Sequence, residues 1–502
     1  MIRDLFMKEL AIPLLTDSRL PLYEQIYSAI RTAILDGRIK KDERLPSTRF
    51  QAEYLQVSRS TVETAYAQLL AEGYIYSEPY RGYFVCDVSD LYQLSGRKSP
   101  AGMERWNAGA DTPGQTGKTD LLQPAKLPVL ADRETESPLP AMDFSPNGID
   151  TEQFPYASFG KILKNLMLDE GGEMLDAGPS FGNMHLRTMI CDYLYRSRSV
   201  HCRPEQIVLG AGNEFLLILL SQILGKDRIA AMESPTYLQA YHTFRNLGYT
   251  VAEIPMDKNG MSSRELGLSG ASLAYVMPSH QFPLGTVMPL KRRLELLSWA
   301  NEKQDRYLIE DDYDSEFRYR GKPVPALQGM DREGKVIYLG TFSRSIAPSV
   351  RVSYMVLPGR LMDTCRKRCG FYSCTVSNIM QHAICEFMET GLFEKNLNRM
   401  RRIYRAKHDF LLNELKQRTW VKDIIGENAG LHLLAEIDTD KPEEVLISRL
   451  GEQRIRVYGI SEYYISRFSG FDRPVLLLGY GGLTTQQMKE ALEKMEDIIC
   501  RP

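Results

Sequence analysis

The chain has 502 residues, of which 43% are hydrophobic and 25% charged, and this length and composition predict a globular protein with more than one domain. Its formal net charge of -2 excludes a globally basic nucleic-acid-binding protein, so any DNA contact must come from a local patch. The longest apolar run, near residues 215–220, is too short to span a bilayer, and the first residues lack a secretory apolar segment, so we expect a cytoplasmic protein. The eight cysteines are scattered without metal-ligand spacing, and we expect neither a metal site nor disulfide bonds.

Residues 19–87 predict three short helices followed by a hairpin. Apolar residues from Leu22 to Ile34 recur with helical spacing, and Gly37 follows as a C-terminal signal. Ser47 is an expected N-cap for a second helix, and Ser58 or Ser60 for a third. Helices joined by a tight turn and followed by a hairpin predict a winged helix.

The third helix leaves its first residues free to contact a ligand. Its apolar positions run from Val62 to Leu70 and face inward, which points Arg59 and Ser60 outward near the helix start. Two short strands then flank a turn that carries Arg81. We therefore expect a cation at the tip of the wing.

The remainder of the chain divides into a linker and an α/β domain. Residues 88–140 are rich in Ser, Gly, Pro and charges and lack periodicity, which indicates a linker. From residue 141 to 502, short aliphatic runs such as Ile229–Met232 alternate with helical stretches such as Leu290–Lys303. This alternation predicts an α/β fold with a largely parallel sheet.

The first domain closely resembles the winged helix of the GntR family. The resemblance rests on the ordered stretches Arg44–Arg49, Val57–Tyr66, Leu69, Glu72–Gly73 and Arg81–Val85. It implies double-stranded DNA as a partner, read by the start of the third helix, with nearby cations on phosphates. The implied DNA-binding residues are Arg49, Ser58, Arg59, Ser60, Thr61 and Arg81. Gln51 departs from the leucine usual in the family, so the second helix is expected to pack differently or to expose the aromatic Phe50.

The second domain resembles fold-type-I, pyridoxal-phosphate-dependent aminotransferases, in the MocR-type (GabR-like) branch of the GntR regulators. The motifs are Gly210–Gly212, Pro278–Gly285, Ile309–Phe317 and Gly340–Arg344, followed by Pro348 and Arg351. The resemblance implies a homodimer that reads a repeated DNA site. It also implies a pocket in which a defined set of residues contacts the cofactor. Those residues are Gly212, Asn213, Tyr237, Asp311, Tyr313, Ser343 and Arg351.

Most of these residues have an implied role toward pyridoxal phosphate. A glycine turn that opens a helix offers N–H groups to a phosphate, while Ser343 and Arg351 add a hydroxyl and a cation. Asp311 matches the carboxylate that keeps the pyridine nitrogen protonated, and Tyr313 matches the phenol that bonds the ring oxygen. Tyr237 is placed to stack on the ring.

The position that decides the chemistry holds Arg344. The family has there the lysine whose neutral amine forms the Schiff base, whereas a guanidinium has a pKa above about 12 and stays protonated. Lys335 and Lys322 are placed unfavourably to replace that lysine. We expect no catalytic residue here, and no covalent bond if pyridoxal 5'-phosphate binds.

Two further positions distinguish the pocket from that of GabR-like members, which bind the carboxylate of an amino acid through two arginines. Gln239 and Glu462 align with those arginines, and a glutamate repels a carboxylate. The three losses together indicate natural divergence of the pocket rather than a single trapping mutation.

The leading hypothesis is a transcriptional regulator whose aminotransferase-like domain dimerises and senses a phosphate-bearing ligand without a covalent bond. One alternative is an active aminotransferase with an appended DNA-binding domain, which the missing lysine opposes. A second is a purely structural dimerisation module with an empty pocket. The effector, the operator and the direction of regulation stay open.

Overall fold

The computed structural model describes residues 21–78, 81–86, 140–169, 172–319, 325–427, 429–466 and 471–500. Of the predicted linker only Pro140 belongs to these ranges, and Pro79, Tyr80 and Lys322 lie outside them. None of the helices in these ranges is long and apolar enough to cross a membrane.

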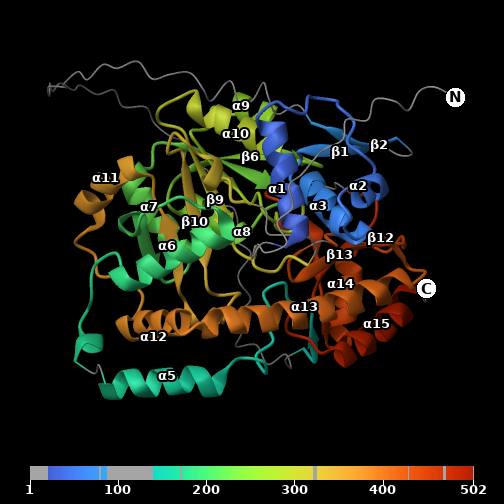
Figure 1. Ribbon diagram of the computed structural model, residues 1–502. Coiled ribbons are helices and arrows are strands. Elements are labelled where there is room, and N and C mark those ends of the chain that lie inside the picture. The colour runs from blue at the N-terminus through green and yellow to red at the C-terminus, as the bar shows by residue number, and fades with distance from the viewer. Residues whose placement is uncertain are drawn as a thin grey trace, which may run out of the picture.

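The N-terminal unit is a winged helix, as its periodicity predicts (Figure 1). Its elements are α1 (Leu22–Leu35), α2 (Thr48–Tyr54), α3 (Arg59–Ala71), β1 (Ile75–Glu78) and β2 (Gly82–Val85). The Ser47 and Ser58 hydroxyls accept the Phe50 and Thr61 backbone N–H groups, which settles the choice between Ser58 and Ser60 as N-cap. β1 and β2 pair antiparallel to form the wing.

The residues that depart from the family pattern in α2 behave in two ways. The Gln51 side chain of α2 is fully buried. Phe50 is exposed and stacks on Tyr54, with ring centroids 6.4 Å apart. The expected exposure of an aromatic is therefore confirmed, and the polar side chain occupies the core position.

The large domain is built on an eight-stranded sheet with the order β4-β11-β10-β9-β8-β5-β6-β7. The five central strands from β10 to β6 run parallel, while β11, β4 and β7 pair antiparallel at the edges. The strands are β4 (Ile207–Gly210), β5 (Ile229–Ser234), β6 (Thr250–Asp257), β7 (Gly260–Met261), β8 (Leu273–Val276), β9 (Tyr307–Asp312), β10 (Val336–Thr341) and β11 (Ser353–Val356). The predicted largely parallel sheet is confirmed.

Helices cover both faces of this sheet because its central strands are apolar on both sides. Alternate residues such as Tyr275 and Ile309 pack with α7 (Asn213–Leu224), α8 (Leu238–Asn246) and α11 (Gly359–Cys369). Their neighbours Ala274 and Leu308 pack on the other face with α9 (Ser263–Leu268) and α10 (Leu290–Asn301). On β9, Asp311 therefore faces one helical layer, while Glu310 and Asp312 face the other.

A smaller C-terminal layer completes the large domain. Its sheet has the order β12-β13-β16-β15, formed by β12 (Val421–Ile425), β13 (His432–Ile437), β16 (Val475–Gly479) and β15 (Tyr458–Gly459). A separate pair joins β3 (Met142–Asp143) to β14 (Ile455–Arg456). The remaining helices are α5 (Tyr156–Asp169), α6 (Met184–Arg198), α12 (Asn378–Glu389), α13 (Leu392–Lys416), α14 (Glu443–Glu452) and α15 (Thr485–Cys500). Short 3-10 turns occur at η1 (Glu173–Leu175), η2 (Pro204–Gln206), η3 (Gln328–Met330), η4 (Pro348–Val350) and η5 (Ile460–Tyr463).

Candidate DNA-binding face and ligand pocket

The start of α3 presents a short run of polar side chains to solvent. The Ser58 Oγ lies 2.8 Å from Ser60 Oγ and 2.7 Å from Thr61 Oγ1, so the hydroxyls are linked at the helix N-terminus. Arg59 is exposed, and its Nε lies 2.7 Å from Glu63 Oε1 one turn later. An exposed ion pair of this kind contributes little to stability, so the guanidinium can exchange Glu63 for a phosphate or a base at low cost.

The other predicted cations stand at the start of α2 and at the wing. Arg49 is exposed on α2. Arg81 is also exposed, with its Nη1 2.5 Å from Glu78 Oε2 and its guanidinium carbon 5.7 Å from the Phe84 ring centroid. The structure adds Arg44, whose guanidinium lies against Gly82 and whose backbone bridges to Phe84 of the wing. Arg44 belongs to the GntR-family motif but was not among the predicted DNA-binding residues.

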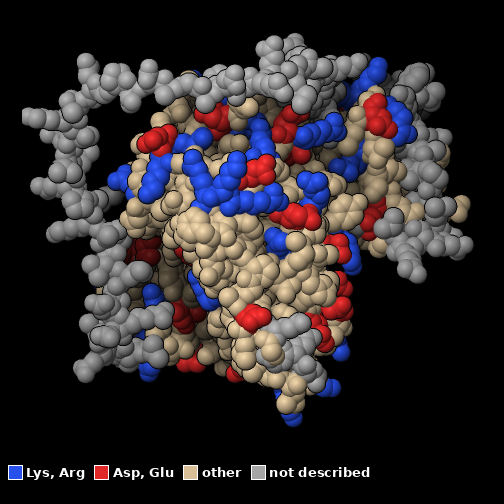
Figure 2. All heavy atoms as spheres, turned by 90° about the vertical axis from the view of Figure 1, so that its left-hand side faces the viewer, with Lys and Arg blue, Asp and Glu red and all other residues tan. Residues whose placement is uncertain are grey.

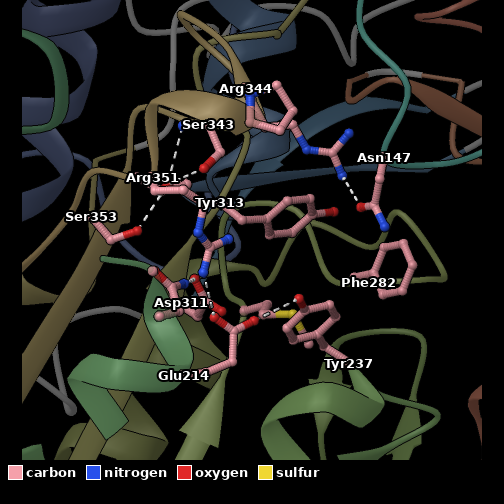
Figure 3. Close-up of a pocket in the computed structure, with 15 residues that line it drawn as sticks. Asn147, Glu214, Tyr237, Phe282, Asp311, Tyr313, Ser343, Arg344, Arg351 and Ser353 are labelled. Carbon is pink, nitrogen blue, oxygen red and sulfur yellow. Dashed lines mark hydrogen bonds and ion pairs between the residues drawn. The ribbon is translucent and has the colours of Figure 1, made fainter. Parts of the chain in front are cut away.

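The seven predicted cofactor-contacting residues all line one cavity of about 280 Å³ (Figure 3). The cavity lies at the carboxyl ends of the parallel strands, where ligands bind in open α/β sheets. Its walls also contain Phe282, Thr341 and Pro348, which belong to the family motifs but were not predicted to contact the cofactor. Four further lining residues lie outside those motifs, namely Asn147, Glu214, Met277 and Ser353. Arg344 belongs to the same lining.

One end of the cavity has the features of a phosphate cradle. Gly212 caps α7 with φ +110°, a backbone conformation that favours glycine, and a Cβ atom there would lie 2.2 Å from Arg351 Nη2. Arg351 donates to the Ala211 carbonyl at 2.9 Å. The Thr341 hydroxyl lies 3.0 Å from both the Ser343 and the Ser353 hydroxyls. Free helical N–H groups, hydroxyls and a guanidinium together can bind an anion.

An acidic side chain shares this end of the cavity. Glu214 Oε2 lies 3.5 Å from Arg351 Nη2, and the two side chains face each other in Figure 3. Glu214 Oε1 lies 3.4 Å from the Tyr237 hydroxyl, which donates to it. A phosphate would compete with this carboxylate for Arg351. Glu214 follows the Gly210–Gly212 motif in the sequence, but its contact with Arg351 could be identified only from the structure.

Asp311 is buried in the cavity wall with both carboxylate oxygens occupied. Asn213 Nδ2 donates to its Oδ1 at 3.0 Å, and the Tyr275 hydroxyl donates to its Oδ2. Burial raises the pKa of Asp311 to about 7, against the lowering effect of these hydrogen bonds. The carboxyl group can therefore hold or release a proton near neutral pH.

Tyr313 is connected to a buried histidine and a buried aspartate. Its hydroxyl lies 2.9 Å from His280 Nδ1, which is also 2.9 Å from Asp314 Oδ2. His280 and Asp314 are almost completely buried, and burial raises the pKa of the Tyr313 phenol. The pair holds the Tyr313 ring in the cavity wall.

Arg344 points away from Asp311 and toward the segment that enters the domain (Figure 3). Its Nη2 donates to Asn147 Oδ1 at 2.8 Å, its Nη1 donates to the Pro146 carbonyl, and its guanidinium carbon is 5.9 Å from the Tyr313 ring centroid. Among the described residues that line the cavity, none is a lysine. Lys335 lies before β10 and donates to the carbonyls of Lys303 and Gln304 at 2.7 and 3.0 Å.

The two positions aligned with effector-binding arginines do not line the cavity. Gln239 is exposed in the first turn of α8, and Glu462 is exposed in η5. η5 nevertheless adjoins the pocket wall, because the Thr236 N–H donates to the Tyr463 carbonyl at 2.9 Å. Of the three positions that differ from GabR-like members, only Arg344 lines the cavity.

Two family profiles match the chain in the order of its domains. Residues 22–85 match the bacterial regulatory proteins of the gntR family, and residues 142–495 match aminotransferase class I and II. The HTH-type transcriptional regulator YdeL of Bacillus subtilis, described as uncharacterized, is 36% identical over 95% of this chain and 96% of its own length. The probable rhizopine catabolism regulatory protein MocR of Rhizobium meliloti is 32% identical over 95% of this chain and 94% of its own length.

Solved structures extend the comparison to enzymes. An archaeal alanine:glyoxylate aminotransferase superposes with a TM-score of 0.65 over 72% of this chain and 90% of that chain, at 24% identity. At this identity the likeness shows the shared fold of the large domain.

Proposed function

Since the chain belongs to the MocR-type HTH transcriptional regulators, which join a GntR winged helix to an aminotransferase class I and II domain, we propose that it couples DNA binding to non-covalent recognition of a phosphate-bearing ring. The natural ligand class is pyridoxal 5'-phosphate or a close relative. In this proposal residues 19–87 read DNA in the cytoplasm, residues 88–140 link the domains, and residues 141–502 bind ligand and dimerise.

The DNA-binding side of the proposal rests on the exposed polar start of α3. Ser58, Arg59, Ser60 and Thr61 stand where a recognition helix meets the major groove. Arg49 and Arg81 are exposed beside it on α2 and the wing, where cations position a protein on phosphates.

A homodimer would present two such units to a repeated site. The face that carries α7 and α11 has clustered Lys and Arg side chains above a broad region without charge (Figure 2). Exposed apolar side chains on these elements include Phe371 and Tyr372 after α11 and Ile218 on α7. Exposed aromatic and aliphatic groups of this kind support contact with a second copy.

The residues in the cavity fit pyridoxal phosphate. Gly212 leaves the space that a Cβ would fill beside Arg351, which suits a phosphate, and the aromatic Tyr237 and Tyr313 flank the volume available to a ring. Asp311, with a pKa raised to about 7, can share a proton with a ring nitrogen. When bound, such a cofactor supplies an aldehyde and an electron-withdrawing ring.

Arg344 is the single observation that carries the non-covalent part of the proposal. A guanidinium remains charged and donates hydrogen bonds, so it can bind an oxygen of the ligand but cannot form a Schiff base with it. Its present acceptors, Pro146 and Asn147, hold it in the cavity wall.

Equilibrium dialysis of the purified chain against pyridoxal 5'-phosphate, with Ser343→Ala and Arg351→Ala as variants, tests ligand binding. A gel shift with the DNA upstream of its own gene, with and without that ligand, tests coupling to DNA. Saturable binding that both substitutions weaken supports the proposal. Absence of binding by the wild-type protein would leave the large domain a structural dimerisation module.

A further inference from the structure

Two cysteines outside the ligand pocket lie within contact distance of each other. Cys191 lies in the middle of α6, and Cys202 lies between the end of that helix and η2. Their sulfur atoms are 3.7 Å apart, and the Cys191 thiol also donates to the Cys202 carbonyl at 3.1 Å. The Cys191 sulfur thus contacts both the side chain and the backbone of Cys202. Only a small movement is needed to bring the two sulfurs to the distance of about 2.05 Å that a disulfide bond requires.

The turn at the end of α6 brings the second cysteine back onto the helix. Ser199 caps the helix with φ +55°, in the left-handed region, and the Val200 N–H donates to the Leu194 carbonyl at 3.3 Å. A left-handed residue at this position reverses the direction of the chain. The two cysteines therefore meet although they are 11 positions apart in the sequence.

Both of these thiols are half-buried, and the exposed residues His201 and Arg203 flank the second one. A different pair, Cys365 and Cys369, lies one turn apart on α11 and is 0% and 1% exposed. A small oxidant in solvent can reach the half-buried pair, whereas the pair on α11 is enclosed.

The protein environment makes the first step of oxidation slow. Burial raises the pKa of both thiols, and the carboxylates of Asp192 and Glu205 raise the pKa of Cys191 further. The hydrogen bond from Cys202 partly offsets this increase for Cys191. Because the thiolate is the reactive form, Cys191 is the expected nucleophile. In a reducing compartment the pair remains as thiols, and a bond forms only under sustained oxidation.

The segment between the two cysteines contains the residue that joins α6 to the central sheet. Arg198 is 3% exposed, its Nε lies 2.7 Å from Asp312 Oδ2, and it also donates to the Ser279 hydroxyl. Asp312 directly follows Asp311, which lines the ligand cavity. A bond between the cysteines would close a covalent loop that includes this buried arginine.

We propose that Cys191 and Cys202 form an oxidation site, which a peroxide converts to a reversible disulfide bond that fixes the turn carrying Arg198. The Cys191 thiolate attacks a peroxide oxygen. An S–O bond forms, the O–O bond breaks, and the hydroxide that leaves takes up the proton lost by Cys191 to become water. 

The second step closes the bond. The Cys202 sulfur attacks the Cys191 sulfur, an S–S bond forms, the S–O bond breaks, and a second water leaves with the Cys202 proton. The two sulfurs together lose two electrons, which reduce one peroxide to two waters. A dithiol reductant reverses the reaction by thiol–disulfide exchange and is itself oxidised to a disulfide.

Peptide mapping of the full chain tests the bond directly. The protein is treated with hydrogen peroxide at about pH 8, denatured, alkylated at its remaining thiols and digested with trypsin without a reductant. Trypsin cleaves after Arg196 and Arg198, so the disulfide joins two peptides that are otherwise separate. We expect this linked pair in most molecules, and its disappearance after dithiothreitol. Trypsin also cleaves after Arg366, between Cys365 and Cys369, and these two cysteines should be recovered alkylated and unlinked.

The exposed Cys500 shows whether the peroxide has acted on the protein. Oxidation of Cys500 without a link between Cys191 and Cys202 would overturn the proposal. A link that joins either of these two cysteines to a different cysteine would overturn it as well.

Thermal unfolding tests the effect of the bond on the turn. Cys202→Ser is nearly equal in size to the wild type and cannot form the bond, so it is the matched variant. Because a cross-link restricts the unfolded chain, peroxide treatment should raise the unfolding midpoint of the wild-type protein by about 2–4 °C and leave that of Cys202→Ser unchanged. An unchanged midpoint in the wild-type protein, or an equal shift in the variant, would show that this bond does not fix the turn.

Discussion

Removing the charge of Glu214 and removing the charge of Arg351 should change the affinity for a phosphate-bearing ligand in opposite directions. Their side chains are 39% and 56% exposed, and Glu214 Oε2 lies 3.5 Å from Arg351 Nη2. A hydrogen bond to a charged group contributes about 1.5–3 kcal/mol, so Arg351→Ala should weaken binding of pyridoxal phosphate by about 10- to 150-fold. The exposed ion pair contributes at most about 1 kcal/mol, so Glu214→Gln should release Arg351 and tighten binding by about two- to fivefold.

Fluorescence titration with pyridoxal 5'-phosphate at fixed ionic strength measures both effects. Arg366→Ala is the control, because this arginine is 53% exposed on α11 and paired with Asp363 away from the cavity lining. The expected signs are opposite for the two pocket variants, with no change in the control. If Glu214→Gln and Arg351→Ala shift the affinity in the same direction, the phosphate does not bind at Arg351.

Three further measurements follow from the structure. Arg59→Ala should weaken specific DNA binding in a gel shift by about 1–3 kcal/mol. Arg264→Ala, on the exposed surface of α9, is the control and should leave the affinity unchanged. Equal affinities of the two variants would refute the assignment of Arg59 to DNA binding. Ser58→Ala removes the N-cap of α3 and should cost about 1 kcal/mol in chemical denaturation of the winged helix, with an unchanged value counting against the cap. Glu233 is completely buried, and burial raises its pKa to about 8. Because the folded state binds this proton more tightly than the unfolded state, the free energy of unfolding should fall as pH rises from about 5 to 8. Glu233→Gln should make this fall smaller. If the wild-type protein and the variant show parallel pH profiles, Glu233 does not contribute.

Local sequence signals were sufficient for the winged helix. Ser47 and Ser58 each cap the helix that follows, and the apolar spacing of α1 and α3 defines the buried faces. The parallel strands of the large domain were also predictable, since each is a short apolar run between helical stretches. The periodicity did not predict the C-terminal sheet, because a strand as short as β15, with two residues, is too short to show a pattern.

The candidate pocket was predicted only as far as its motifs extend. The family resemblance named Asp311, Ser343 and Arg351 because each belongs to an ordered motif. The partners that define their environment are distant in sequence, such as Tyr275 for Asp311 and Asn147 for Arg344, and only the fold brings them together. The position of Glu462 outside the cavity lining could likewise not be read from an alignment.

We propose that this regulator binds its ligand without a covalent bond because Arg344 stands at the lysine position. Mass spectrometry of the protein after incubation with pyridoxal 5'-phosphate and reduction with borohydride tests it most directly, with Arg344→Lys measured in parallel. We expect no stoichiometric label at the pocket of the wild-type protein, alongside saturable binding before reduction, and a label at residue 344 in the lysine variant. A stoichiometric pyridoxyl label on any pocket residue of the wild-type protein would contradict it.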